Sequence, residues 1–95
     1  MKIQPVRGTH DIYGNELKIF NIIEKNIRVS AKAFGFNEIN TPIFESSDLF
    51  SKPLGEQSDV VLKEMYAFND RNNSSLTLRP EYTTPIIRAA ISNDL

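Results

Sequence analysis

A single carboxylate lies between two prolines near the end of the sequence, in the string LRPEYTTP. This carboxylate, Glu81, follows an alternating run at residues 76–79 that is typical of a short strand. If the strand extends that far, Arg79 and Glu81 point to the same side, at a sheet edge where polar groups can converge on a ligand. From the residue types alone, the favoured interpretation is a surface ion pair between Arg79 and Glu81, worth at most about 1 kcal/mol.

Other residues offer less for chemistry. The only histidine, His10, follows a glycine and a threonine in an expected loop, where such a side chain is usually solvated. The chain has no cysteine, which excludes disulfides and thiolate metal sites. The sequence also has no Ser/His/Asp order, no cluster of metal ligands and no glycine-rich phosphate loop. Four acidic residues are expected to be caps or solvated side chains, namely Glu45, Asp48, Glu56 and Asp59.

Composition and charge indicate an ordinary small globular domain. The 95 residues are 40% hydrophobic and 24% charged, which permits one modest core. The net charge of −1 and the scattered basic residues leave no stripe for nucleic acid. The longest apolar run, at residues 65–68, is too short to cross a membrane, and the first residues lack the apolar block that is typical of a signal peptide. We therefore expect a cytoplasmic protein without membrane contact.

One long amphipathic helix is the most distinct element. Apolar residues recur at three- and four-residue steps over residues 16–34, which predicts a helix with one apolar side. Asp11 or Asn15 is expected to cap its N-terminus, and Glu24 and Arg28 are spaced to pair on its polar side. The glycine that follows directly suits the position after the last helical residue. The apolar residues of this pattern are Leu17, Phe20, Ile23, Ile27, Ala31 and Phe34.

The middle of the chain predicts a strand and short helical pieces. Residues 36–45 alternate imperfectly around Pro42, which predicts a strand that is bent or lies at an edge there. The serine pair that follows is expected to cap a short helix at residues 48–50. Another short apolar piece is expected at residues 60–62.

A hairpin and a last helix complete the prediction. Short strands at residues 66–68 and 76–78 flank the turn NDRNNSS, in which one of the adjacent asparagines is expected in the left-handed conformation. The leucines of the second strand, at positions 76 and 78, are expected to enter the core. Pro85 suits the first turn of the last helix, with Thr84 as its N-cap. Glu81 thus lies between a strand end and a helix start, in a small α+β domain.

Four strings carry a resemblance to a known family. They occur in the order VRGTHDIYG, GFNEINTPIFE, LFSKPLGEQSDVVLKEMYAFNDR and LTLRPEYTTPIIRA, and they extend from Val6 to Ala90. Together they resemble the histidyl-tRNA synthetases, which are class II aminoacyl-tRNA synthetases. The second string is similar to motif 1, a long helix that runs into a strand with a proline. The last is similar to the Arg-Pro-Glu-Gly-Thr run of the family.

The resemblance implies a fold and a set of site residues. Residues 1–95 would be the N-terminal part of a class II catalytic domain, with a mixed, mainly antiparallel sheet. The expected dimer interface of motif 1 includes Pro42, Ile43 and Phe44. The expected histidine-binding residues are Glu81, Tyr82 and Thr83. In this family the carboxylate at position 81 would receive the α-ammonium of histidine, and the Thr83 hydroxyl would add an acceptor. Tyr82 stands where the family has glycine, so strain is expected if that position needs a positive φ.

The resemblance also implies an activity that this stretch does not complete. The parent protein would be a histidine–tRNA ligase, a homodimer that uses histidine, ATP, Mg²⁺ and tRNA(His). The family's motif 2 arginine, motif 3 and anticodon-binding domain are expected after Leu95. No catalytic or metal-binding residue is therefore assigned within the 95 residues, and the fragment alone is expected to be inactive.

Two alternatives remain open from the sequence. The first is a synthetase-like regulatory subunit of the histidine-biosynthesis ATP phosphoribosyltransferase, which has the same catalytic-domain fold and does not aminoacylate. Tyr82 fits such a relaxed relative, whereas the strings KEMYAFNDR and LRPE favour the enzyme. The second is a dimerisation fragment that binds no ligand.

Overall fold

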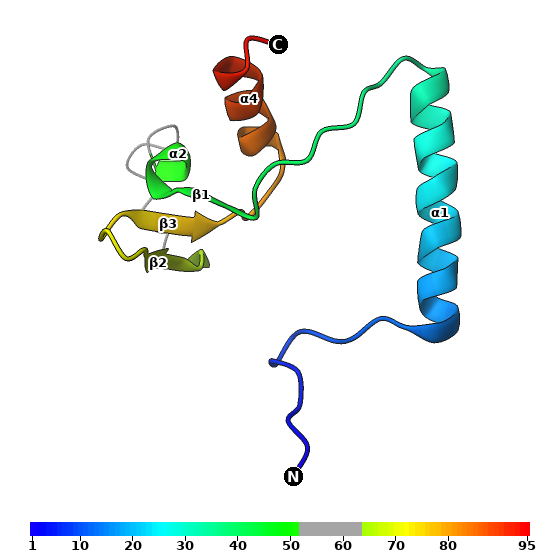
Figure 1. The fold of residues 1–95 in the computed structure, drawn as a ribbon, viewed down its shortest axis with the longest axis horizontal. Coiled ribbons are helices and arrows are strands. Elements are labelled where there is room, and N and C mark those ends of the chain that lie inside the picture. The colour runs from blue at the N-terminus through cyan, green and yellow to red at the C-terminus, as the bar shows by residue number, and fades with distance from the viewer. Residues whose placement is uncertain (52–63) are drawn as a thin grey trace. The chain divides into compact units, whose positions relative to one another are not determined.

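The computed structural model describes residues 1–51 and 64–95 (Figure 1). The chain has an α+β fold and divides into two compact units, residues 1–38 and residues 39–95, which are described separately. The short piece predicted at residues 60–62 lies outside the described residues. The elements are α1 (Gly14–Ala33), β1 (Phe44–Ser46), α2 (Ser47–Ser51), β2 (Ala67–Asn69), β3 (Ser75–Leu78) and α4 (Thr83–Ser92).

The first unit contains the predicted long helix, α1. Its C-terminal end is confirmed: Gly35 has φ 82, a left-handed conformation that glycine adopts without steric cost. The N–H of Gly35 donates to the Lys32 carbonyl and that of Phe36 to the Ala31 carbonyl, at 3.0 Å each, which closes the helix with a Schellman motif. The predicted pair between Arg28 and Glu24 is also confirmed, at 2.7 Å.

The start of α1 differs from the prediction. Neither Asp11 nor Asn15 caps the helix, because the N-cap residue is Tyr13 and it makes no side-chain cap hydrogen bond. Gly14 has φ 63, so a glycine in the left-handed region turns the chain into the helix. The sequence pattern located the helix but not its first residue. In the described residues, no helix has both the length and the apolar character needed to span a membrane.

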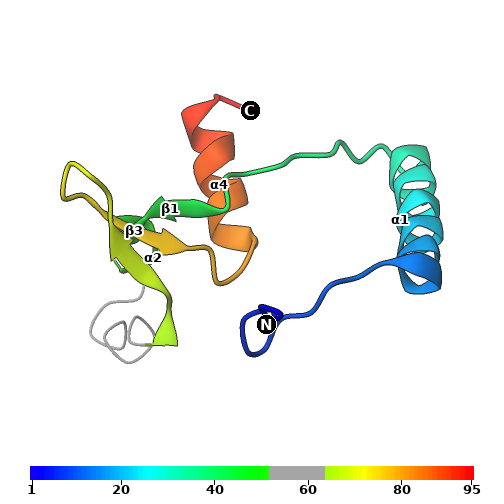
Figure 2. The same ribbon diagram turned by 60° about the horizontal axis from the view of Figure 1, so that its bottom comes forward.

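The second unit is built on an antiparallel sheet with strand order β1-β3-β2. The predicted hairpin is confirmed: β2 and β3 pair antiparallel, and their turn is visible in Figure 2. Asn73 takes the left-handed position with φ 64, while the Asp70 carboxylate accepts the backbone N–H groups of Asn72 and Ser74, at 2.9 Å each. The strand predicted over residues 36–45 is regular only from Phe44, where pairing with β3 begins. Pro42, just before it, has no N–H to donate to a ladder.

The covered face of this sheet is the opposite of the predicted one. Thr77 is fully buried, whereas Leu78 is 38% exposed and Leu76 is half-buried, so the expected core role of the two leucines is wrong. Helix α2 contacts β1, β3 and α4, and the two helices lie over the face that carries Thr77 (Figure 1). The hydroxyls of Ser47 and Thr77 share a hydrogen bond of 2.7 Å, which satisfies the buried threonine.

Candidate functional site

The segment between β3 and α4 carries the candidate site. Helix α4 begins at Thr83, and its N-cap is Tyr82 rather than the predicted Thr84. Pro85 is the third helical residue, inside the first turn as expected, and it is buried. The predicted position of Glu81, between a strand end and a helix start, is therefore confirmed.

The Glu81 carboxylate caps α4. It accepts hydrogen bonds from the backbone N–H of Thr83 and from that of Thr84, the latter at 3.1 and 3.2 Å to its two oxygens. A negative charge at this end is also favoured by the helix dipole. The hydroxyl of Thr84 lowers the pKa of the Glu81 carboxyl most, slight burial opposes it, and the two backbone N–H groups add to the lowering. Glu81 is therefore an exposed, ionised carboxylate at neutral pH.

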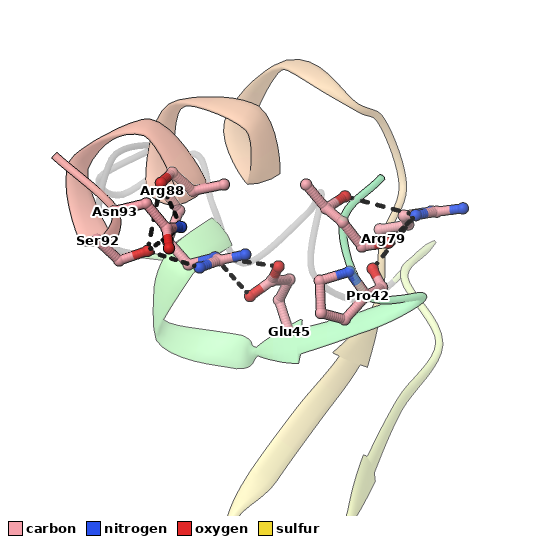
Figure 3. A network of polar contacts seen from close by, with 8 residues as sticks. Pro42, Glu45, Arg79, Arg88, Ser92 and Asn93 are labelled. Atoms are coloured by element: carbon pink, nitrogen blue, oxygen red, sulfur yellow. Dashed lines mark hydrogen bonds and ion pairs between the residues drawn. The ribbon is translucent and has the colours of Figure 1, made fainter. Parts of the chain in front are cut away.

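Arg79 does not form the ion pair that the residue types favoured. Its guanidinium Nη1 donates to the carbonyl oxygens of Thr41 and Pro42, at 2.8 and 3.3 Å (Figure 3). Its Nη2 donates to the Tyr82 hydroxyl at 3.1 Å, and its Cζ lies 4.4 Å from the centre of the Tyr82 ring. The positive charge of Arg79 thus faces the segment before β1 and an aromatic ring. The Glu81 carboxylate contacts the N-terminus of α4 instead.

Tyr82 is accommodated without backbone strain. Its φ of −103 and ψ of −22 lie in the right-handed helical region, which any residue adopts. The strain expected from a tyrosine at a glycine position is therefore absent. The side chain is 61% exposed, and it contacts Arg79.

A second polar group lies between β1 and α4 (Figure 3). Glu45, only 9% exposed, accepts a hydrogen bond of 3.1 Å from the Nε of Arg88 through Oε1, and its Oε2 lies 3.0 Å from the same nitrogen in an ion pair. Arg88 also donates to the Ser92 hydroxyl at 3.0 Å. The prediction that Glu45 is a cap or a solvated acid is wrong. The strand register indicates that Glu45 is buried, because Glu45 pairs with the buried Thr77 and shares its face of the sheet.

The comparisons with known proteins give the family. The family model described as "Histidyl-tRNA synthetase" matches residues 8–93. The chain belongs to the histidyl-tRNA synthetase family. The predicted resemblance is confirmed, and the match covers both units of the structure.

Individual relatives support this family assignment. The histidine–tRNA ligase of Rhodospirillum rubrum is 54% identical over 93 residues, which are 98% of this chain and 22% of the relative. The crystal structure of apo S. aureus histidyl-tRNA synthetase matches with a TM-score of 0.81 at 36% identity, over 98% of this chain and 24% of that one. The chain thus spans less than a quarter of the length of these relatives.

One further solved structure bears on the alternative function. An ATP phosphoribosyltransferase regulatory subunit/histidyl-tRNA synthetase from Bacillus halodurans matches with a TM-score of 0.74. It covers 97% of this chain and 23% of that one, at 21% identity. At that identity, the likeness to this histidyl-tRNA synthetase family chain shows the fold alone.

The three residues expected at a family dimer interface lie at the surface of the second unit. Pro42 and Ile43 are exposed, Ile43 to 61%. Phe44 is 43% exposed and makes an edge-on contact with Phe68 at 5.8 Å between ring centres. Their side chains are therefore available for a partner.

The described part of the chain does not provide a metal site. In residues 1–51 and 64–95, no group of three or more His, Cys, Asp or Glu side chains is placed to hold a metal ion. Among the other predicted acids, Asp48 lies in the first turn of α2. Glu56 and Asp59 lie outside the described residues.

Proposed function

We propose that this chain is the N-terminal part of a histidine–tRNA ligase. That enzyme would activate histidine with ATP to histidyl-adenylate and transfer it to tRNA(His). The proposal is supported by the family match and by relatives named histidine–tRNA ligase at up to 54% identity. The observation that carries it is the ionised, exposed Glu81 carboxylate at the junction of β3 and α4, in the family's Arg-Pro-Glu string.

Glu81 would hold the α-ammonium of histidine. An ionised carboxylate has about four lone-pair sites, which in Glu81 face the backbone N–H groups and the hydroxyls of Thr83 and Thr84. Because Glu81 is exposed, an ammonium group, which has three donors, can reach the carboxylate and take the place of the hydroxyl contacts. The Thr83 hydroxyl would add an acceptor, and Tyr82 would flank the amino-acid site. Adenylation then depends on positioning the carboxylate of histidine against ATP.

The other substrates and the assembly are part of the same proposal. ATP and tRNA(His) would be bound by parts of the enzyme other than the residues described, as would the Mg²⁺ that accompanies ATP. Pro42, Ile43 and Phe44 would contribute to a homodimer. The enzyme would act in the cytoplasm, where its tRNA product is used.

Glu81→Gln in the full-length protein tests the proposal. The change keeps the shape and removes the charge, so it leaves the ammonium of histidine without its partner. We expect kcat/KM for histidine in ATP–pyrophosphate exchange to fall about 30- to 3,000-fold, which corresponds to about 2–5 kcal/mol. The KM for ATP should change little, because Glu81 does not contact ATP in this proposal.

Glu16→Gln is the matched control, since Glu16 is an exposed carboxylate in the first turn of a helix, α1. Its histidine kinetics should equal those of the wild type. A Glu81→Gln enzyme within a few-fold of wild-type kcat/KM would show that Glu81 is only a helix cap. Histidine binding without any pyrophosphate exchange would instead favour the regulatory-subunit alternative.

A further inference from the structure

One arginine ties together two segments that are distant in sequence. Arg79 binds the carbonyl oxygens of Thr41 and Pro42, the two residues before Ile43, at 2.8 and 3.3 Å. The same guanidinium contacts both the hydroxyl and the ring face of Tyr82. We call this set of contacts, made by Arg79 with Thr41, Pro42 and Tyr82, the Arg79 clasp.

The clasp depends on the shape of the guanidinium group. Arginine presents five N–H donors in a rigid plane, so it can serve two carbonyls and a phenol while stacking on a ring. A lysine ammonium keeps the charge but has no plane to stack and no fork to divide among these partners. Arg79 is half-buried, and its bond to the Thr41 carbonyl is partly shielded from water, whereas those to Pro42 and Tyr82 are exposed.

The clasp fixes the two residues that flank Glu81 and Pro80. Arg79 precedes them and Tyr82 follows, and their side chains contact each other across this short segment. Pro80 has a fixed φ, which removes further freedom. The backbone N–H of Arg79 donates to the Ile43 carbonyl at 2.9 Å, so this end of the segment is also joined to the chain before β1.

We propose that Arg79 and Tyr82 are positioning residues for the Glu81 carboxylate. The clasp holds the backbone of Glu81 from one side, and the N-terminus of α4 holds its carboxylate from the other. The carboxylate is thereby fixed relative to the Pro42 segment before a substrate arrives, which reduces the entropy lost on binding. This inference rests on the proposed binding of a primary ammonium by Glu81.

Tyr82 gives the clasp contacts that the glycine of the family pattern would not provide. A glycine at position 82, as in the family pattern, would offer the guanidinium neither a ring nor a hydroxyl. Here both are present, and the tyrosine adopts an ordinary backbone conformation. The departure from the family pattern therefore adds a contact to the site rather than a strained residue.

The test uses the full-length protein and separates histidine affinity from folding. We expect Arg79→Lys and Tyr82→Ala each to raise the KM for histidine about tenfold, with the KM for ATP within about twofold of wild type. Tyr82→Phe keeps the ring and loses only the hydroxyl, so it should raise the KM about threefold. The double variant Arg79→Lys/Tyr82→Ala should be no more than about twofold worse than the poorer single variant, because both changes break the same contact.

Matched controls and a reference variant make each outcome decisive. Arg71→Lys and Tyr66→Ala alter exposed residues outside the clasp and should leave the histidine KM unchanged. Lower melting temperatures with an unchanged histidine KM in Arg79→Lys and Tyr82→Ala would overturn the proposal, as would fully multiplicative effects in the double variant. Glu81→Gln is measured in the same assay. If it is also silent, the proposed function fails, whereas silence of the clasp variants alone rejects only the clasp.

Discussion

The Glu81 carboxylate serves α4 as a cap and, in the proposed function, serves histidine as an anion. The two roles are compatible because the helix N–H groups hold the carboxylate in place and keep it ionised. The prediction from the sequence places Glu81 correctly between a strand and a helix, but it gives Thr84 as the N-cap of that helix. A glutamate just before the N-cap residue can reach the first amides only if the chain turns sharply there. In the structure Tyr82 makes this turn, with φ −103 and ψ −22, and the alternating pattern of the strand does not show where such a turn begins.

The cap predicts a pH dependence. The folded-state pKa of Glu81 lies below its ordinary value of 4.5, so its contribution to stability is present above that value and is lost as the pH falls through the lowered pKa. We expect Glu81→Gln to weaken protection of the α4 amides from hydrogen exchange by about 0.5–1 kcal/mol near neutral pH. The difference from wild type should shrink as the pH falls below 4.5 and through the lowered pKa of Glu81.

The measurement is hydrogen exchange of peptides from α4, with peptides from α1 as an internal reference. Glu16→Gln again serves as the control and should leave α4 unchanged. Equal protection of α4 in wild type and Glu81→Gln at neutral pH would contradict the cap. A difference that persists undiminished at low pH would show that the effect is not due to the charge of Glu81.

Among the elements, α1 and the β2–β3 hairpin were predictable because their signals are local. The three- and four-residue apolar steps and Gly35 determine α1, and the turn with Asn73 determines the hairpin. The covered face of the sheet was not predictable in the same way. It depends on α2 and α4, which lie over Thr77 rather than Leu78. Alternation shows that a strand has two faces, but not which of them the helices cover.

The attachment of α4 to β1 gives a prediction about stability. Arg88→Met leaves the Glu45 carboxylate in a largely buried place without its partner. Because Arg88 is itself partly exposed, we expect a loss of about 2 kcal/mol in the local stability of α4, below the cost of a fully buried pair. Adding Glu45→Met should restore part of the loss, since no unpaired charge then remains.

Hydrogen exchange of α4 peptides measures the local stability of α4 in the wild type, in Arg88→Met and in Glu45→Met/Arg88→Met. Arg28→Met is the matched control, because Arg28 pairs with Glu24 and Glu38 and all three side chains are more than half exposed. Such an exposed pair should contribute no more than about 0.5 kcal/mol to α1. If Glu45→Met/Arg88→Met is less protected than Arg88→Met alone, the buried-charge explanation is wrong.

At the scale of the whole molecule, α1 carries apolar surface that the other residues of its own unit do not bury. None of the residues of α1 is buried, although its apolar stripe includes Phe20, Ile23 and Ile27. Apolar surface of this extent marks contacts with other protein. The sequence predicted the stripe from its periodicity, but the partner of a stripe is set by residues elsewhere. The relatives are more than four times longer than this chain, so the rest of the proposed enzyme and a second subunit are the expected cover.

Ile43→Asp tests the proposed dimer more cleanly than a change at Phe44. Ile43 is 61% exposed, so an aspartate there should cost the second unit little stability. At an interface, the same carboxylate would be desolvated without a partner, and we expect the dimer of the full-length protein to weaken at least about 30-fold.

Phe44→Asp should weaken the dimer and also lower the melting temperature, because Phe44 packs on Phe68. Sedimentation velocity over a range of concentrations gives the dimer constant, and Ile91→Asp, at an exposed residue of α4, is the control. A dimer constant unchanged by Ile43→Asp would place the interface elsewhere, whatever Phe44→Asp does to the melting temperature.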